Sequence, residues 1–115
     1  MREERSDYNG SLIVIASYKP REGKDEGLKE VLKDHMPILR KEKLITDFPA
    51  IVLKAKDGSY LEIFEWKSQE AINQTHQSKN VLALWKRFDE VCTYVNLSDI
   101  EECKNLFASF EPVKL

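Results

Sequence analysis

The sequence lacks the features that mark membrane, secreted and nucleic-acid-binding proteins. Its longest unbroken apolar run, Leu12 to Ala16, is too short to cross a bilayer. The N-terminal Arg2-Glu3-Glu4-Arg5 does not have the apolar core of a signal peptide, which predicts a cytoplasmic protein. The net charge of −2 gives no field that would collect nucleic acid or an anionic membrane. We therefore expect no nucleic-acid or membrane partner.

Residues for metal, nucleotide and disulfide chemistry are also scarce. The two cysteines, Cys92 and Cys103, form no CxxC pair and are predicted to be ordinary buried thiols rather than a disulfide. Neither His nor Cys is grouped as metal ligands need to be. The four glycines form no GxGxxG motif or phosphate-binding loop, and no Ser-His-Asp arrangement can be read from the sequence.

What remains is the composition of one small globular domain. The chain has 115 residues, of which 42% are hydrophobic and 33% charged, enough for a single core and far from a disordered composition. Residues 1–10 are polar and are predicted to form a flexible tail. Residues 11–115 are predicted to form the domain.

The first half of the domain reads as a strand followed by a helix. Residues 12–18 are apolar and largely β-branched, and Pro20 ends this predicted strand. A helix is predicted from Gly23 to about Lys43, with His35 on its apolar stripe and a kink or break at Pro37. The other stripe residues recur every three or four positions: Leu28, Val31, Leu32, Met36 and Leu39.

A hairpin with an Asp57-Gly58 turn is the strongest local signal. A two-residue type I′ turn there would pair Lys56 with Ser59 and, further out, Leu53 with Glu62 and Ile51 with Phe64. In this register one face carries Ile51, Leu53, Ala55, Tyr60, Glu62, Phe64 and Trp66. The other face carries Val52, Lys54, Leu61, Ile63 and Glu65. Neither face is cleanly polar, so both are predicted to be at least partly covered.

The second half reads as helices followed by a last strand. Ser68 is a predicted cap of the second helix, and Ser78 of a further segment after a break near Gln77. That segment has a clear apolar stripe: Val81, Leu84, Trp85, Phe88, Val91 and Cys92. Residues 98–101 form a capping box for a short helix, and residues 106–111 alternate as a strand would.

The order of these elements predicts an α+β fold. It is a ferredoxin-like βαββαβ plan, with helices on one face of an antiparallel sheet. The second apolar face then needs a cover, and the simplest cover is the same face of another copy. We therefore expect a homodimer.

Several segments resemble the antibiotic biosynthesis monooxygenase (ABM) superfamily of dimeric α+β barrels. They are residues 18–24, which open the first helix, residues 65–71, which leave the third strand, residues 76–78 before a helix that contains Val81 and Trp85, and residues 110–113 near the end. The likeness covers about residues 11–113. The superfamily includes cofactor-free quinol and polyketide oxygenases, haem-degrading enzymes and members with no known reaction.

The resemblance can be examined for haem by residue type. Haem-degrading members have an Asn on the first strand, where this chain offers Ser17, and an axial His whose place falls close to Trp85. An indole cannot coordinate iron, which leaves only His76 from an earlier turn. We therefore expect no haem and no other cofactor.

Cofactor-free oxygenation, as the resemblance implies it, needs a base, donors that hold the substrate anion, and an apolar cavity. His76 is the first candidate for the base, because the ordinary pKa of histidine lies near working pH. Its alternative is a polar residue that caps the helix break. His35 is the second candidate, and its alternative is a hydrogen-bonded core residue.

Glu62 is the third candidate, because a carboxylate on a mostly apolar sheet face must be paired or have a raised pKa. It can equally lie near water or pair with a Lys or Arg across the dimer. The substrate pocket is predicted to have an aromatic wall, although aromatic residues at this spacing also build plain cores. Its candidate residues are Trp66, Trp85, Phe64, Tyr18 and Phe88.

Two functions follow from these residues. The first is a cofactor-independent monooxygenase that acts on a small aromatic or quinol-like substrate in an apolar pocket. The second is a non-catalytic module of the same fold that binds a small ligand or serves for dimerisation. Two solvent-facing histidines and the lack of a cavity between helices and sheet would contradict the enzyme.

Overall fold

The computed structural model describes residues 10–115, so the predicted tail lies, apart from Gly10, outside the described residues. The strands are β1 (Leu12–Pro20), β2 (Ile51–Lys54), β3 (Tyr60–Trp66), β4 (Cys92–Tyr94) and β5 (Glu111–Pro112). The α-helices are α1 (Asp25–Lys41), α2 (Gln69–Gln74) and α3 (Lys79–Val91). Three short 3-10 helices complete the chain: η2 (Thr75–Gln77), η3 (Leu97–Asp99) and η4 (Glu101–Lys104).

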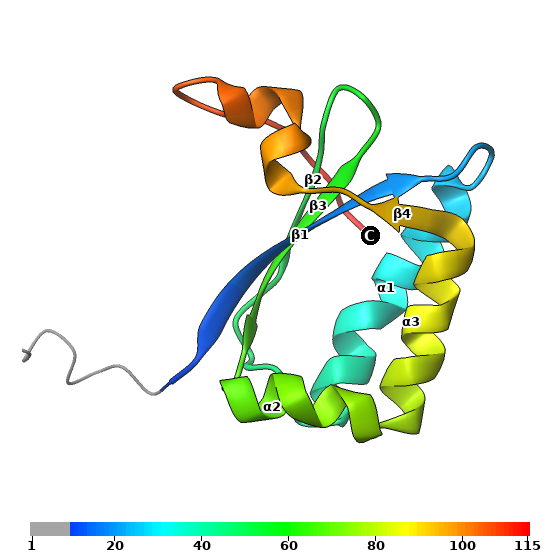
Figure 1. Ribbon diagram of the computed structural model, residues 1–115, viewed down its shortest axis with the longest axis vertical. Coiled ribbons are helices and arrows are strands. Elements are labelled where there is room, and N and C mark those ends of the chain that lie inside the picture. The colour runs from blue at the N-terminus through cyan, green and yellow to red at the C-terminus, as the bar shows by residue number, and fades with distance from the viewer. Residues whose placement is uncertain (1–9) are drawn as a thin grey trace, which may run out of the picture.

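The strands form one antiparallel sheet in the order β4-β1-β3-β2-β5. Figure 1 shows α1 and α3 side by side on one side of this sheet, with α2 crossing below its end. The first four strands with α1 and α3 make the ferredoxin-like plan, and β5 extends the sheet beyond β2. The predicted α+β fold class is confirmed.

Helix α1 buries its predicted apolar stripe and continues through Pro37. Leu28, Leu32 and Leu39 are fully buried or nearly so, and His35 is 4% exposed. Pro37 cannot donate a hydrogen bond to the carbonyl of Lys33, but both residues are exposed, so water can satisfy that carbonyl. The predicted helix break at Pro37 is therefore wrong, because the lost bond faces solvent.

The β2–β3 hairpin closes with a three-residue loop rather than a two-residue turn. The Ala55 amide donates to the Ser59 carbonyl at 2.8 Å, and the Gly58 amide donates to the Ala55 carbonyl at 3.0 Å. Gly58 has a φ of +94°, whereas Asp57 is not in the left-handed region that a type I′ turn requires. This arrangement is a turn that ends in a glycine bulge.

The extra loop residue moves the register of the hairpin by one position. Val52 pairs with Glu62, Lys54 with Tyr60, and Ile51 with Ile63, so the predicted pairs are wrong. Tyr60, Glu62, Phe64 and Trp66 still share one face, because they alternate along a single strand. Their neighbours on β2 change, however: Val52 and Lys54 join them, while Ile51, Leu53 and Ala55 turn to the other face.

The helical segments after β3 begin as predicted. The Ser68 hydroxyl accepts a hydrogen bond from the Ala71 amide at 3.0 Å, and the Ser78 hydroxyl accepts one from the Val81 amide at 3.2 Å. Both serines are therefore N-caps. The chain breaks between them at η2, as the sequence predicts.

The last third of the chain differs from prediction. Cys92 is the first residue of β4 rather than the end of a helix, and β4 pairs with β1. Only Glu111 and Pro112 form a strand, against β2, so the predicted strand over residues 106–111 is wrong. Leu106 is 90% exposed, since this segment has left the sheet. The predicted capping box is also wrong, because Ser98 lies inside η3.

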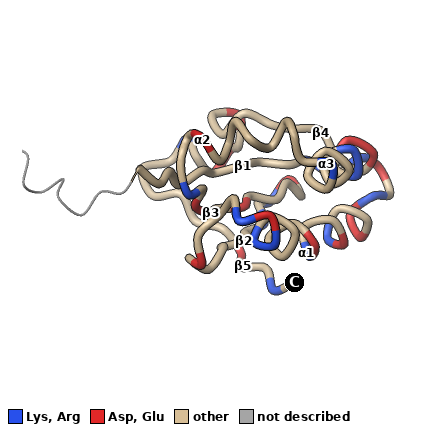
Figure 2. Tube along the Cα trace, turned by 90° about the horizontal axis from the view of Figure 1, so that it is seen from below, with Lys and Arg blue, Asp and Glu red and all other residues tan. Residues whose placement is uncertain are grey.

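The outer face of the sheet is only partly covered. Ile100 packs against Ala55 and Leu61 at the hairpin end, whereas Ile13 and Ile15 on β1 are 59% and 45% exposed. Figure 2 shows Lys, Arg, Asp and Glu intermixed along α1 and at the hairpin turn, while most of β1 carries no charge. No helix among the described residues is long and apolar enough to span a membrane.

Candidate functional site

A cavity of about 430 Å³ lies between the sheet and the helices. Aromatic and small apolar side chains dominate its walls, and among the described residues no Lys, Arg, Asp or Glu lines it. Residues from β1, α1, β3, α3 and β4 contribute: Val14, Ala16, Tyr18, His35, Phe64, Trp66, Trp85, Phe88 and Tyr94.

Strand alternation places these residues together. Val14 pairs with Phe64 and Ala16 with Glu62, and all four side chains point to the helix-covered face. His35 enters from the buried stripe of α1, and the aromatic residues of α3 close the other side.

A buried hydrogen-bonded group forms the polar end of this cavity. His35 Nδ1 lies 2.8 Å from Glu62 Oε1, and the Tyr18 hydroxyl donates to the same oxygen at 2.9 Å. Glu62 is fully buried, and His35 and Tyr18 are each 4% exposed. Glu62 is therefore paired within the chain, as expected for a carboxylate on this sheet face.

These bonds determine which nitrogen of His35 carries its proton. In the neutral imidazole, an Nδ1 that donates to the Glu62 carboxylate leaves Nε2 with its lone pair. Nε2 has no hydrogen-bond partner among residues 10–115. Phe64 and Phe88 hold the ring edge-on, at centroid distances of 5.4 and 4.9 Å. The ring of His35, which lines the cavity, is thus held in place by Glu62 and two phenylalanines.

The two tyrosines of the cavity remain protonated donors. Burial raises the pKa of Tyr18 well above its ordinary value, and the nearby Glu62 carboxylate raises it further. Burial, followed by the charge of Asp89, raises the pKa of Tyr94 to about 12. Both hydroxyls therefore keep their protons at neutral pH.

The structure brings most of the predicted site residues together and leaves one outside. His35 lines the cavity and Glu62 lies behind it, and the predicted aromatic residues all line the cavity: Trp66, Trp85, Phe64, Tyr18 and Phe88. His76 is exposed on η2 and does not line the cavity. It contacts the edge of Trp85 at a centroid distance of 5.7 Å. The order of preference between the two histidines therefore reverses.

Three lining residues were not among the predicted site residues. Val14 and Ala16 lie in the predicted first strand, four and two residues before Tyr18. The two-residue period of a strand therefore places both on the same face as Tyr18, and this signal was sufficient to find them. Tyr94 has no such signal, because the apolar stripe of α3 runs on through Cys92 and hides the start of β4.

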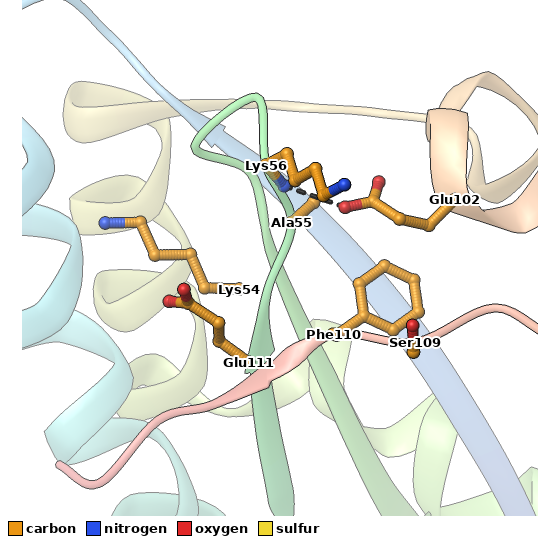
Figure 3. A pocket seen from close by; sticks show the side chains of 7 residues that line it. All are labelled: Lys54, Ala55, Lys56, Glu102, Ser109, Phe110 and Glu111. Atoms are coloured by element: carbon orange, nitrogen blue, oxygen red, sulfur yellow. Dashed lines mark hydrogen bonds between the residues drawn. The ribbon is translucent and has the colours of Figure 1, made fainter.

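A separate hollow, at the hairpin end of the sheet, is shown in Figure 3. There Glu102 Oε2 accepts a hydrogen bond from the Lys56 amide at 2.8 Å, which fastens η4 to the hairpin. The Lys54 side chain points away from Glu102 in this view. Because its buried carboxylate holds the loop in place, this hollow is a structural junction rather than a site for acid–base chemistry.

Cysteine and metal chemistry have little support in the described residues. No three His, Cys, Asp or Glu side chains within residues 10–115 lie together as a metal site requires. Cys92 and Cys103 are both free; Cys92 is buried as predicted, whereas Cys103 is only partly buried, so the prediction of a buried thiol is wrong there. Burial raises the pKa of the Cys92 thiol to about 11, so it is a poor nucleophile.

The fold is similar to that of a protein of known structure. SnoaB, described as a cofactor-independent oxygenase from Streptomyces nogalater, matches with a TM-score of 0.64. The match covers 75% of this chain and 87% of that chain, at 12% sequence identity. At this identity the likeness concerns the fold. No protein-family model matches the sequence, and no curated protein sequence matches it.

Proposed function

We propose that the protein is a member of the ABM superfamily and a cofactor-independent monooxygenase for a small aromatic or quinol-like substrate. The observation that carries this proposal is the buried His35–Glu62 pair at the polar end of an aromatic cavity. The fold of SnoaB, an oxygenase that needs no cofactor, supports it. The cytoplasmic location stays a prediction.

The first chemical step is removal of a proton from the substrate hydroxyl. His35 Nε2 accepts this proton, and the Glu62 carboxylate at 2.8 Å stabilises the imidazolium that forms. The substrate anion is electron-rich enough to react with O₂. The apolar walls keep water from the charged intermediate. Overall the substrate loses two hydrogens and gains one oxygen atom, and the other oxygen leaves as water.

Oxygen uptake tests the proposal. We expect the wild-type protein to consume O₂ with at least one member of a panel of dihydroquinones and polycyclic phenols, in the presence of a metal chelator. The other function under consideration, a non-catalytic ligand-binding module, predicts tight binding of a panel member, seen as quenched Trp66 and Trp85 fluorescence, without oxygen uptake. That outcome would contradict the oxygenase.

We also propose that the protein is a homodimer. The support is the exposed apolar side chains of Ile13, Ile15 and Ile51, which lie on the face of the sheet that the helices do not cover. A second copy turned about a two-fold axis would place the same residues opposite them. The cavity that contains His35 opens on the other face, so each protomer would keep its own site.

A further inference from the structure

A second cavity, of about 490 Å³, lies on the β2 side of α1. Its apolar walls include Leu32, Met36 and Val52, and Glu62 forms part of the same lining. Because Glu62 also holds His35, its carboxylate stands between this cavity and the aromatic one. The proposed oxygenation uses the aromatic cavity and assigns nothing to the second.

One oxygen of Glu62 has no donor. Both hydrogen bonds, from Tyr18 and His35, go to Oε1, while Oε2 is buried and has no partner among the described residues. A buried carboxylate oxygen without a donor is strongly unfavourable, and native proteins seldom leave one. A donor group inside the second cavity would remove this cost.

Two cationic side chains also line the cavity. Lys33 and Arg40 belong to its lining, and neither forms an ion pair with a described residue. Arg40 donates only to the Phe48 carbonyl, at 3.2 Å. Asp47 is the one exposed acidic side chain of the lining, and Leu115, the last residue of the sequence, also belongs to it. Arg40 follows His35 by five residues, which corresponds to about 7.5 Å along the helix axis.

We propose that this cavity is a second ligand site, for a small molecule with a hydroxyl or amine at one end and a carboxylate at the other. The hydroxyl or amine donates to Glu62 Oε2, the apolar body contacts Leu32, Met36 and Val52, and the carboxylate pairs with Arg40. Such a ligand shares the Glu62 carboxylate with His35. The proposed site depends on these residues and does not require the protein to be an oxygenase.

Three matched probes test both ends of the site by calorimetry. In 4-hydroxybenzoate the hydroxyl and the carboxylate lie at opposite ends of the ring, so it is compared with benzoate, which lacks the hydroxyl, and with phenol, which lacks the carboxylate. We expect 4-hydroxybenzoate to bind about tenfold or more tightly than either, because each single-ended probe loses one charge-assisted bond. Equal binding of the three probes, or no binding at millimolar concentration, would overturn the proposal.

A pair of arginine and lysine variants locates the carboxylate. Arg40→Ala is expected to weaken binding of 4-hydroxybenzoate and benzoate about tenfold and to leave phenol unchanged. Lys41→Ala, on the next residue of α1 and outside the lining, is the matched control and should change none of them. A loss that is equal for both variants would overturn the pairing with Arg40.

Backbone NMR separates this site from the aromatic cavity. Binding of 4-hydroxybenzoate should shift the amide signals of Ala50, Val52 and Val113, which line or border the second cavity. Shifts confined to the indole signals of Trp66 and Trp85 would place the probe in the aromatic cavity and overturn the proposal. Because none of these measurements uses O₂, failure of the second site and failure of the oxygenase are distinguishable.

Discussion

Replacing Tyr18 by Phe isolates one hydrogen bond of the buried group. The Tyr18 hydroxyl donates to Glu62 Oε1 at 2.9 Å, in a place where neither side chain reaches solvent. The ring itself is stacked on Phe88 at a centroid distance of 4.9 Å, and phenylalanine keeps that contact. The change therefore removes a donor from a buried carboxylate without removing apolar burial.

The expected loss follows from the value of such a bond. A hydrogen bond to a charged group contributes about 1.5–3 kcal/mol, so Tyr18→Phe should lower the free energy of unfolding by about 2 kcal/mol. In urea this corresponds to a midpoint shift of about 1 M. Unfolding followed by tryptophan fluorescence and by circular dichroism measures it, because Trp66 and Trp85 both lie beside the cavity.

Tyr94→Phe is the matched control. Tyr94 lines the same cavity but is 58% exposed, so its loss should stay within about 0.5 kcal/mol. A double-mutant cycle between Tyr18→Phe and Glu62→Gln should show a coupling energy of about 1 kcal/mol or more. If Tyr18→Phe is no more destabilising than Tyr94→Phe, the buried group does not depend on this bond and the reasoning is refuted.

Three further predictions concern the dimer, the thiols and acid stability. Light scattering should report a dimer at micromolar concentration, and Ile15→Lys on the outer face should give a folded monomer; a wild-type monomer would contradict the proposal. Ellman's reagent should modify half-buried Cys103 well before Cys92, whose pKa is raised to about 11 by burial; the reverse order would show that β4 opens readily. Hydrogen bonds from Asn80 and Ser78 lower the pKa of Glu42. The contribution of Glu42 to stability should therefore be present above the carboxyl pKa of the unfolded chain and be lost as pH falls through the lower pKa of the folded protein. A stability difference between the wild-type protein and Glu42→Gln that grows on acidification would contradict this prediction.

The register of the hairpin shows how far local sequence rules reach. The Asp57-Gly58 pair correctly predicts a tight turn, and Gly58 does take the left-handed conformation. The pair does not decide whether two or three residues form the loop, since the same glycine serves a type I′ turn and a glycine bulge. One extra residue then changes which β2 side chains lie beside Glu62.

The candidate site was predictable where it depends on periodicity. His35 on the apolar stripe of α1 and Glu62 between apolar neighbours on β3 both follow from patterns of 3.6 and 2 residues. Their 2.8 Å contact does not, because it depends on how α1 crosses the sheet. His76 was preferred because the ordinary pKa of histidine lies near working pH, but that property does not decide where the side chain points.

Oxygen consumption by two histidine variants tests the proposed function most directly. With the dihydroquinone that the wild-type protein oxidises fastest, His35→Ala should lower kcat/KM by about 10²–10⁴-fold, the usual value of a positioned base. His76→Ala removes an exposed imidazole outside the cavity and should leave kcat/KM within about twofold of the wild-type value. Equal activity of His35→Ala and the wild-type protein, or a loss confined to His76→Ala, would contradict His35 as the base.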